Sequence, residues 1–490
     1  MGGLLASCVR SNQRPNVLLV LADDWSFPHA GCYGDPFVRT PHFDRVAREG
    51  VKFTNSFSCS PSCTPSRSSL LTGRHQWQCG EAGLLYGSIP LGLPIVTHAL
   101  EDSGYRTGFT GKGWAPGDWK ALGLNRHPNG QEFNRLKHPG KLPAGVDARD
   151  YAANFQEFLD TTDKEKPFFF WLGSTEPHRV YDPEAYRRLD RGLEKVPVPG
   201  CLPDTEATRK DLAAYYSEIE WHDRQIGKAM ALLGEKQMLD NTLVILTSDN
   251  GMPFPRAKVN LYDAGLRMPL AMHWPARLER GITNHALVSH TDITETILEA
   301  TGVGSLPGST GNSLLRKPDR PYVLAGMERH VYARPEGATY PMRSLRTRDY
   351  LYIRNFAPDR WPTGGDFISS NKTPHGDIDA TPMLEDLQKD STKWELAAGK
   401  RPAEELYAVE KDPWQLRNLA QDPEHAVARE QLAGLLEKEL RAGGDPRIEG
   451  KDPWQRYPYR QTTGFGASFN STLSEEARAK ARDLARHKPE

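Results

Sequence analysis

Cysteine is scarce in this chain of 490 residues. The six cysteines stand at positions 8, 32, 59, 63, 79 and 201. Their spacing matches no zinc-binding pattern, and they are too few to form a disulfide scaffold in so long a chain. The sequence therefore excludes a small disulfide-stapled fold and a zinc-finger type of protein, although one or two disulfide bridges remain compatible with the count.

Long hydrophobic runs and an excess of charge of one sign are also absent. No stretch approaches the ~20 apolar residues needed to cross a bilayer. The 62 lysines and arginines nearly balance the 63 aspartates and glutamates, so no overall field draws the chain to nucleic acid or to a membrane surface. Attraction for an anionic ligand must therefore be local to a pocket.

Glycine and proline, in contrast, are abundant, with 43 and 38 residues. Their share exceeds the usual one and predicts long connecting loops, which often carry binding and catalytic residues. The length alone allows about three domains, but large α/β domains exceed the average size, so we expect two.

Strands and helices alternate along the first two-thirds of the chain. Apolar runs predict strands at residues 16–22, 51–57, 105–110, 168–173 and 243–246, and amphipathic patterns predict helices at 41–49, 95–102, 208–233 and 291–301. Such alternation predicts a mainly parallel sheet covered by helices on both faces.

The pattern changes in the last third. Residues 343–354 alternate at period two like one antiparallel strand, and residues 403–409 offer a strand to pair with it. Helices are expected at 423–441 and 474–487, which gives a smaller α+β domain. The glycine-containing segment 362–365 and the polar stretch after it predict a loop that rims a pocket.

The most informative segment begins at Cys63 and reads CTPSRSSLLTGR. It resembles the signal at which a maturation enzyme converts a cysteine of sulfatases into the aldehyde formylglycine. Cys59 opens a similar segment, but Cys63 stands where the arginine is required, so only Cys63 fits. For a bare Cys-x-Pro-x-Arg, a turn before an ordinary short helix would be the preferred explanation. The Leu-Thr-Gly-Arg extension at the right spacing favours the maturation signal instead.

The chemistry of such an aldehyde suits a sulfate ester, whose sulfur is crowded and anionic. One hydroxyl of the hydrated aldehyde attacks sulfur, and the other expels sulfate when the aldehyde forms again. Pro65 and Ser66 are helix start signals, and Gly73 is a stop signal. The nucleophile is therefore expected at the positive end of a helix.

Acidic residues follow two of the predicted strands. Asp23 and Asp24 end the first strand, and Asp249 and Asn250 follow the strand near residue 245. Carboxyl ends of strands converge in an open α/β sheet, and three carboxylates with one amide oxygen suit a hard cation such as Ca²⁺. Each pair alone is also common turn chemistry.

Taken together, these segments resemble type I sulfatases, the formylglycine-dependent family, over most of the chain. The resemblance implies an alkaline-phosphatase-like α/β domain, with a mainly parallel sheet sandwiched by helices, at residues 15–340. It implies a C-terminal α+β subdomain with an antiparallel sheet at 341–490. It assigns Ca²⁺ binding to Asp23, Asp24, Asp249 and Asn250, and catalysis to Cys63, Arg67, Lys112, His178 and Lys258.

The roles implied for these residues match the demands of the reaction. Arg67 and Lys112 would stabilise the aldehyde hydrate and the sulfate, while His178 and Lys258 would contact sulfate and protonate the leaving group. One departure is Trp114, which stands where many family members have a histidine. We hypothesise that His75 replaces that histidine.

Substrate binding is assigned to Trp114, His75, Arg329, His330 and Arg343. Tryptophan offers a flat face to a sugar ring, and arginine pairs with planar anions. For Arg329, His330 and Arg343, solvated loop or sheet-edge positions are the alternative. Segments 249–262, 340–344 and 405–419 resemble the heparan N-sulfatase (sulfamidase) branch, whereas 262–269 resembles general O-sulfatases, so N- and O-sulfate both stay open.

Three functions follow as alternatives. The first is an exo-acting hydrolase that removes sulfate from a sulfated saccharide, expected to be of the glycosaminoglycan type, after maturation by a formylglycine-generating enzyme. The second is a phosphate or phosphonate monoester hydrolase of the same superfamily, and the third is a glycan-binding protein without turnover. Nucleic acid is not an expected partner, and the sequence leaves the oligomeric state open.

The N-terminus suggests export. Residues 5–8 (LASC) resemble a lipobox, the site at which bacterial lipoproteins are cleaved and lipidated on cysteine. Residues 1–14 are then a signal or lipoprotein remnant, with a periplasmic or lipid-anchored protein held through Cys8. The residues before Cys8 are too few for a complete signal peptide, so either the true start lies upstream or the likeness is due to chance.

Overall fold

The computed structural model describes residues 14–461 except 162, 164, 317 and 318. The strands of this part are β1 (Asn16–Ala22), β2 (Val51–Phe57), β3 (Arg106–Gly111), β4 (Gln131–Glu132), β5 (Phe168–Gly173), β6 (Thr242–Ser248), β7 (Arg267–His273), β8 (Ile282–Ser289), β9 (Val323–Met327), β10 (Met342–Arg346), β11 (Tyr350–Asn355) and β12 (Glu404–Ala408). They form an eight-stranded sheet in the order β4-β3-β5-β1-β6-β7-β2-β8 and a four-stranded sheet in the order β12-β11-β10-β9.

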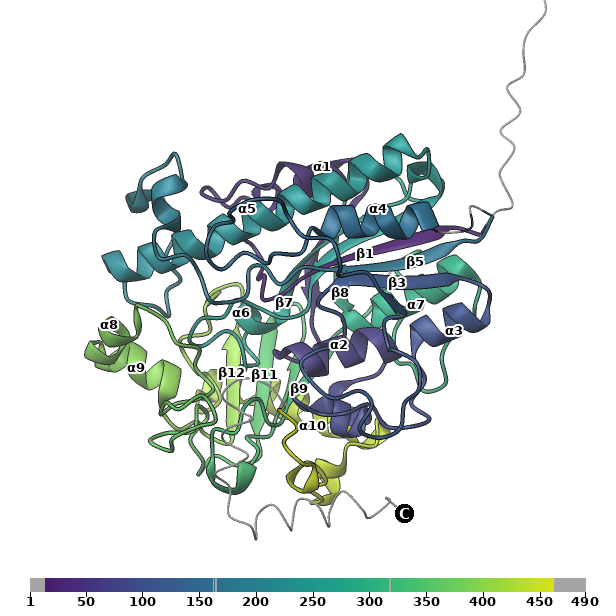
Figure 1. The fold of residues 1–490 in the computed structure, drawn as a ribbon. Helices are drawn as coiled ribbons and strands as arrows, with labels where there is room; N and C mark the ends of the chain where they lie inside the picture. The colour runs from purple at the N-terminus through teal and green to yellow at the C-terminus, as the bar shows by residue number, and fades with distance from the viewer. Residues whose placement is uncertain (1–13, 162, 164, 317–318, 462–490) are drawn as a thin grey trace, which may run out of the picture.

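The α-helices surround these sheets. They are α1 (Pro41–Glu49), α2 (Cys63–Thr72), α3 (Val96–Asp102), α4 (Tyr151–Thr161), α5 (Glu206–Glu235), α6 (Asp263–Leu266), α7 (His290–Thr301), α8 (Leu384–Lys389), α9 (Ser391–Ala398) and α10 (Ala426–Ala442). Figure 1 shows α1, α4 and α5 on one face of the large sheet and α2, α3 and α7 on the other.

The large sheet is buried on both faces, as its central strand shows. In β1, Leu18 and Val20 pack in the hydrophobic cluster that includes α1, α4 and α5, whereas Leu19 and Leu21 pack with α2, α3 and α7. Successive side chains of a strand point to opposite faces, so a continuous apolar run is needed when helices cover both. Strands β3, β5, β1 and β6 are parallel, while β7 runs antiparallel to β6 and β2.

The small sheet is entirely antiparallel. Helix α10 covers one face, where Leu436 and Leu440 pack in one cluster with Leu345 and Tyr352. The single strand predicted for residues 343–354 is wrong, because the chain turns back between Arg346 and Tyr350 and forms the β10-β11 hairpin. The predicted partner strand is confirmed, since β12 pairs with β11.

The small sheet also recruits a strand from earlier in the chain. Strand β9 ends at Met327, well before the boundary predicted at residue 340, and pairs with β10. The predicted boundary therefore falls within the segment that joins two strands of the same sheet.

Most predicted elements of the large domain are confirmed, and α1, β2 and β5 match to the residue. Elements that the sequence pattern did not predict include α4, β7, β8 and β9. Strand β7 is apolar but contains Pro269, which argues against a strand. Strand β8 begins with exposed residues, three of its first four being polar, and therefore lacks the continuous apolar run typical of this sheet.

Several predictions fall on parts that the structure does not describe. Cys8 and the helix expected at residues 474–487 lie outside the described residues. Of the described cysteines, all five are free thiols. Within residues 14–461, apart from the four positions left out, no helix combines the length and apolar character needed to span a bilayer.

Candidate active site

Four neighbouring parallel strands end together at one edge of the large sheet. Gly111 of β3 lies opposite Gly173 of β5, Leu21 of β1 also lies opposite Gly173, and Ala22 lies opposite Ser248 of β6. Because the strands are parallel and in register, the residues that follow them meet. This edge gathers Asp23 and Asp24, Lys112, His178, Asp249 and Asn250.

Two features show that the backbone at this edge is tightly constrained. Gly111 has φ +75°, and a Cβ there would collide with the carbonyl oxygen of Gly173. Asp24 has φ +77° although it is not glycine, and β-branched Val259 next to Lys258 has φ +68°. Such conformations are costly and occur most often at functional sites.

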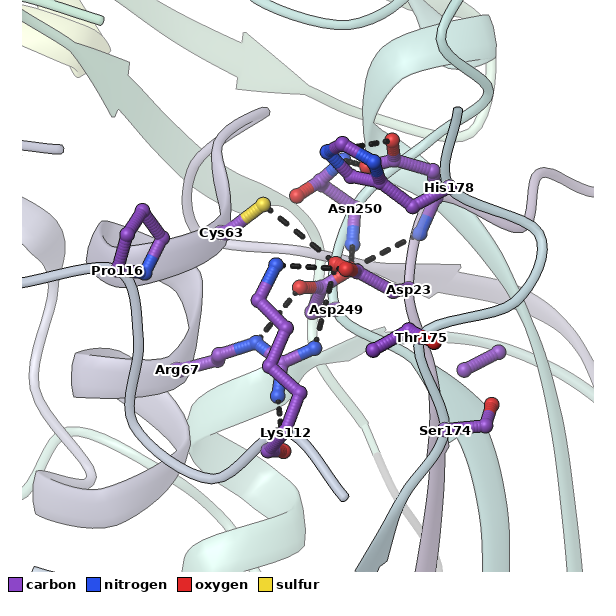
Figure 2. A network of polar contacts seen from close by, with 12 residues as sticks. Asp23, Cys63, Arg67, Lys112, Pro116, Ser174, Thr175, His178, Asp249 and Asn250 are labelled. Atoms are coloured by element: carbon purple, nitrogen blue, oxygen red, sulfur yellow. Dashed lines mark hydrogen bonds and ion pairs between the residues drawn. The ribbon is translucent and has the colours of Figure 1, made fainter. Parts of the chain in front are cut away.

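Helix α2 presents Cys63 as its first residue, with extended Ser62 as the N-cap. The helix starts two residues before the predicted Pro65 and ends at Gly73, whose φ of +67° gives the left-handed C-cap that favours glycine. Cys63 Sγ lies 3.5 Å from Asp23 Oδ1 (Figure 2). Burial, aided by the charge of Asp23, raises the pKa of Cys63, so the unmodified residue is a neutral thiol here.

Arg67 ties the helix to the strand ends. Its Nε donates to Asp249 Oδ2 at 2.8 Å, and one Nη lies 3.3 Å from Asp23 Oδ1. The other Nη donates to the carbonyl oxygens of Lys112 and Gly113 at 2.7 and 2.9 Å. The guanidinium is completely buried and uses its fork on four oxygens, so it fixes the relative positions of α2, β1, β3 and β6 (Figure 2).

Three carboxylates form a compact oxygen cluster. Asp23, Asp24 and Asp249 each offer an oxygen within 4.8 Å of the others, and all three are buried. Burial raises the pKa of Asp249. Burial acts in the same direction on Asp23, but the charges of Lys112, His178 and Arg67 outweigh it and hold that pKa well below its usual range.

Asn250 completes the oxygen cluster. Its Nδ2 donates to Asp24 Oδ1 at 2.6 Å, while its Oδ1 is buried and accepts no hydrogen bond from the described residues. A buried amide oxygen without a donor is rare, and a hard cation would satisfy it. The residues present therefore fit a Ca²⁺-type ion.

Two lysines and one histidine face this cluster. Lys112 Nζ lies 2.6 Å from Asp23, and Lys258 Nζ lies 2.7 Å from Asp24. Burial alone would lower the pKa of Lys258, but the charge of Asp24 raises it well above its usual value, so the ammonium form persists. His178 Nε2 lies 3.8 Å from Asp24.

Above the cluster opens a cavity of about 640 Å³. It is lined by Cys63, Lys112, His178 and Lys258, and by two of the residues predicted to bind substrate, Trp114 and His330. The Trp114 indole is 2% exposed and donates to Ser68 Oγ at 2.8 Å, so only a small part of it reaches the cavity. His330 Nδ1 lies 2.8 Å from Ser62 Oγ, beside Cys63.

Three other residues predicted to bind substrate lie elsewhere. The His75 ring is buried and stacks on Trp77 at 4.6 Å, outside the cavity, which contradicts its proposed role as the replacement histidine. Arg329 donates to the carbonyl oxygens of Tyr457 and Pro458 and does not line the cavity.

Arg343 is the third of these corrections. Its guanidinium is completely buried, with Glu328 at 2.8 Å and Asp445 at 2.5 Å, between the rings of Trp77 and Trp454. A guanidinium paired with two buried carboxylates has no free donor for a sugar carboxylate. Its place is structural, because it joins the small sheet to the segment after α10.

The cavity also contains residues that the sequence analysis did not name. Asn371 and Asp379 line it from the loop between β11 and α8, within the polar stretch that was expected to rim the pocket. Tyr86 and Arg149 line other parts of the wall. None of them stands in a recognisable motif, so only the general position of the loop was available from the sequence.

Comparisons with protein families agree with this arrangement. The Sulfatase family matches residues 15–303, and the family described as N-sulphoglucosamine sulphohydrolase, C-terminal, matches residues 257–362. Human N-sulphoglucosamine sulphohydrolase is 32% identical over 498 residues, covering 90% of this chain and 91% of the human protein. An ulvan-active sulfatase of Formosa agariphila is 28% identical and covers 89% and 81% of the two chains.

Solved structures show the same architecture. A protein in complex with its substrate D-glucosamine-2-N,6-O-disulfate matches with a TM-score of 0.64 and 19% identity, covering 90% of this chain and 100% of that one. The phosphonate monoester hydrolase of Agrobacterium radiobacter matches with a TM-score of 0.63 and 20% identity over 88% and 96% of the two chains. Likenesses at such identity establish the fold, and they confirm the predicted alkaline-phosphatase-like architecture.

Proposed function

This chain belongs to the sulfatase family, and from that premise we propose that it removes sulfate from a glycosaminoglycan-type saccharide by means of a formylglycine formed at Cys63. The observation that carries the proposal is the position of Cys63. Its side chain lies at the start of α2, 3.5 Å from Asp23, at the base of a cavity that also contains Lys112 and Lys258. After conversion, the aldehyde hydrate would supply the nucleophile.

A cation supports this chemistry. Ca²⁺ would be held by Asp23, Asp24, Asp249 and the Oδ1 atom of Asn250. The three carboxylates are balanced by three buried cations, namely Arg67, Lys112 and Lys258. The protein groups alone therefore leave the site without net positive charge, and the bound ion would supply the charge that attracts an anionic sulfate.

His178 is suited to protonate the leaving group. Its Nδ1 must donate to the carbonyl oxygen of Arg179, because a carbonyl oxygen can only accept. That hydrogen bond orients the ring and leaves Nε2 beside Asp24 in the cavity. Lys258, which also lines the cavity, would stabilise negative charge on the same side of the substrate.

His330 takes the place that the sequence suggested for His75. It lies in the cavity next to the Cys63 segment, and its Nδ1 is paired with Ser62 Oγ at 2.8 Å. Burial and the nearby charge of Lys258 lower the pKa of His330 to about 3, so the ring is neutral near pH 7 and only weakly basic. A sulfate anion bound beside Lys258 would offset that charge, raise the pKa and make the ring a better proton acceptor. We assign to it the removal of a proton at the nucleophile, the role left vacant by Trp114.

The proposed substrate is a sulfated glucosamine at the end of a glycan. The match of 32% to N-sulphoglucosamine sulphohydrolase over 90% of this chain supports an amino sugar, and it makes N-sulfate the first choice. A cavity of about 640 Å³ lies within the usual size of small-ligand sites and favours a terminal residue over an internal one. A formylglycine-generating enzyme is the proposed maturation partner, and export with lipid attachment at Cys8 stays part of the proposal.

The test is sulfate release by protein coexpressed with a formylglycine-generating enzyme. N-sulfated and 6-O-sulfated glucosamine are compared side by side, with Cys63→Ala as the blank. Release from the N-sulfated sugar alone would support a sulfamidase, and release from the 6-O-sulfated sugar alone would support an O-sulfatase. A second assay compares release of sulfate and phosphate from matched aryl esters. Faster release of phosphate than of sulfate would contradict the proposal.

A further inference from the structure

Asp379 brings an additional carboxylate into the cavity. It comes from the loop between β11 and α8, lines the same cavity as Cys63, and has a side chain that is 28% exposed. It does not belong to the oxygen cluster of Asp23, Asp24 and Asp249. The reaction as described above gives it no role.

The backbone on either side of Asp379 is fixed. Two residues before it, Asp377 Oδ2 accepts a hydrogen bond from Arg334 at 2.8 Å. Two residues after it, Thr381 Oγ1 donates to Asp211 Oδ2 at 2.5 Å. These anchors hold the Asp379 carboxylate in place without using its own oxygens, so it is available to a ligand and preorganised.

One oxygen of this carboxylate has no donor. Asp379 Oδ2 is buried and accepts no hydrogen bond from the described residues. The same oxygen forms an ion pair with Lys258 Nζ at 3.7 Å, beyond hydrogen-bond distance, because Lys258 donates to Asp24 at 2.7 Å. A buried carboxylate oxygen without a hydrogen bond is unfavourable. A ligand hydroxyl that meets the exposed part of this carboxylate in the cavity would therefore be bound strongly.

The chemistry of a carboxylate narrows the identity of that donor. An ionised carboxylate only accepts hydrogen bonds, and it repels other anions. The sulfate group is attracted to Lys112 and Lys258 at the base of the cavity, while the ring that carries it presents hydroxyl groups to the wall. We propose that Asp379 accepts a hydrogen bond from a hydroxyl of the sulfated sugar residue and thereby selects sugars with a free hydroxyl at that ring position.

This inference rests on the proposed function, since it names a specificity residue of the same site. It also has a consequence for multiply charged substrates. A second sulfate or a carboxylate at the selected ring position would lie against Asp379 and bind poorly, so such a group must be removed before this protein acts.

The test combines a variant with modified substrates. Matured wild type, Asp379→Asn and the control Asp386→Asn, which changes a carboxylate on α8 that pairs with Lys389, are assayed for kcat/KM. The substrates are the sulfated glucosamine that the wild type hydrolyses, its monodeoxy analogues, and an aryl sulfate. Thermal unfolding of the three proteins checks that each is folded.

In the wild type, loss of the selected hydroxyl should lower kcat/KM about ten- to a hundredfold, the usual value for a hydrogen bond to a charged group. In Asp379→Asn, kcat/KM for the same deoxy analogue should be less than about threefold below kcat/KM for the full substrate. The ratio of sugar to aryl sulfate turnover should fall about tenfold or more in Asp379→Asn and stay unchanged in Asp386→Asn.

Two results would overturn the inference while leaving the proposed function intact. In the first, removal of each hydroxyl lowers kcat/KM by the same factor in the wild type and in Asp379→Asn. That result would mean that no hydroxyl contacts Asp379. In the second, Asp379→Asn loses sugar and aryl sulfate turnover to the same degree, as expected if Asp379 only positions Lys258. Absence of sulfate release by the wild type from all substrates would instead contradict the proposed function, and this inference with it.

Discussion

Asn250 donates a hydrogen bond to Asp24 Oδ1 at 2.6 Å, while its own Oδ1 stays buried without a donor from the described residues. The amide is thus held with its oxygen among three buried carboxylates. Oxygens gathered in this way repel one another unless a cation lies between them. The Asn250–Asp24 pair therefore links the fold of two strand ends to the proposed binding of a cation.

Calcium should stabilise the folded protein. A ligand that binds only the native state at a hundred times its Kd adds about 2.7 kcal/mol, so the Tm should fall after treatment with chelator and recover when Ca²⁺ is added. Asn250→Ala should lose most of this shift, whereas Asn284→Ala on β8 should keep it. Equal Tm values with chelator and with Ca²⁺ would contradict the assignment of the cluster.

Arg67 should be essential for stability as well as for maturation. Replacement by alanine leaves the buried Asp249 without its ion-pair partner and leaves Asp23 paired with Lys112 alone. Loss of one member of a buried ion pair costs about 3–5 kcal/mol. Urea unfolding should show this loss when Arg67→Ala and wild type are compared with Cys63 unconverted in both. Arg316→Ala is the control, because its pair with Glu299 is exposed and should contribute less than about 1 kcal/mol.

Arg343 should prove structural. Arg343→Met removes the charge that neutralises Asp445 and, together with Arg447, neutralises Glu328. We expect a loss of about 3–5 kcal/mol in unfolding free energy. The exposed Arg354, on the neighbouring strand β11, provides the control Arg354→Met, which should change stability little. A raised KM for the sugar with unchanged stability would restore the substrate-binding role that the sequence suggested.

Replacement of His75 and replacement of His330 should have different effects on kcat. His75→Ala should keep its kcat, because the ring stacks on Trp77 outside the cavity. His330→Ala should lower kcat by about a hundredfold or more, the usual contribution of a positioned acid or base. A large loss in His75→Ala together with normal turnover in His330→Ala would reverse the assignment.

Stability should depend on pH through Glu218. Both of its carboxylate oxygens are buried without a partner from the described residues, and burial, aided by the charge of Glu176, raises its pKa to about 9. In the folded state Glu218 therefore keeps its proton up to a high pH. In the unfolded chain the same residue loses its proton above the ordinary glutamate pKa of 4.5. The stabilising proton is fully effective below pH 4.5, and stability is lost as the pH rises towards 9.

Glu218→Gln removes this titration. Its unfolding free energy relative to the wild type should therefore increase by about 4 kcal/mol between pH 5 and pH 8, as three units of pH imply. Glu235→Gln at the exposed end of α5 serves as the control and should follow the wild type. Parallel pH profiles for Glu218→Gln and the wild type would show that Glu218 finds a partner in solution.

The sequence was sufficient for the features that depend on local pattern. The run Asn16–Ala22 is apolar throughout because helices cover both of its faces, and this same burial makes Asp23 and Asp24 conspicuous at its end. Parallel register then brings Asp249 to Asp23. The placement of the oxygen cluster therefore follows from strand boundaries, which the sequence predicts well.

Residues whose position depends on long-range packing could not be predicted in this way. Arg343 stands in an apolar-polar alternation that allowed an exposed side chain, but Asp445 lies 102 positions later and buries it. Asp379 reaches the cavity from a segment without a motif. The hairpin at Arg346–Tyr350 was missed because both its strands continue the same period of two.

The central claim is that sulfate release depends on conversion of Cys63. The most direct test measures the initial rate of sulfate release from N-sulfated and 6-O-sulfated glucosamine against the fraction of Cys63 converted, as determined by peptide mass spectrometry on samples matured to different extents. We predict a rate on at least one of the two sugars that rises in proportion to the converted fraction and extrapolates to zero. Release by unconverted protein or by Cys63→Ala, or no release from either sugar by fully converted protein, would contradict the account.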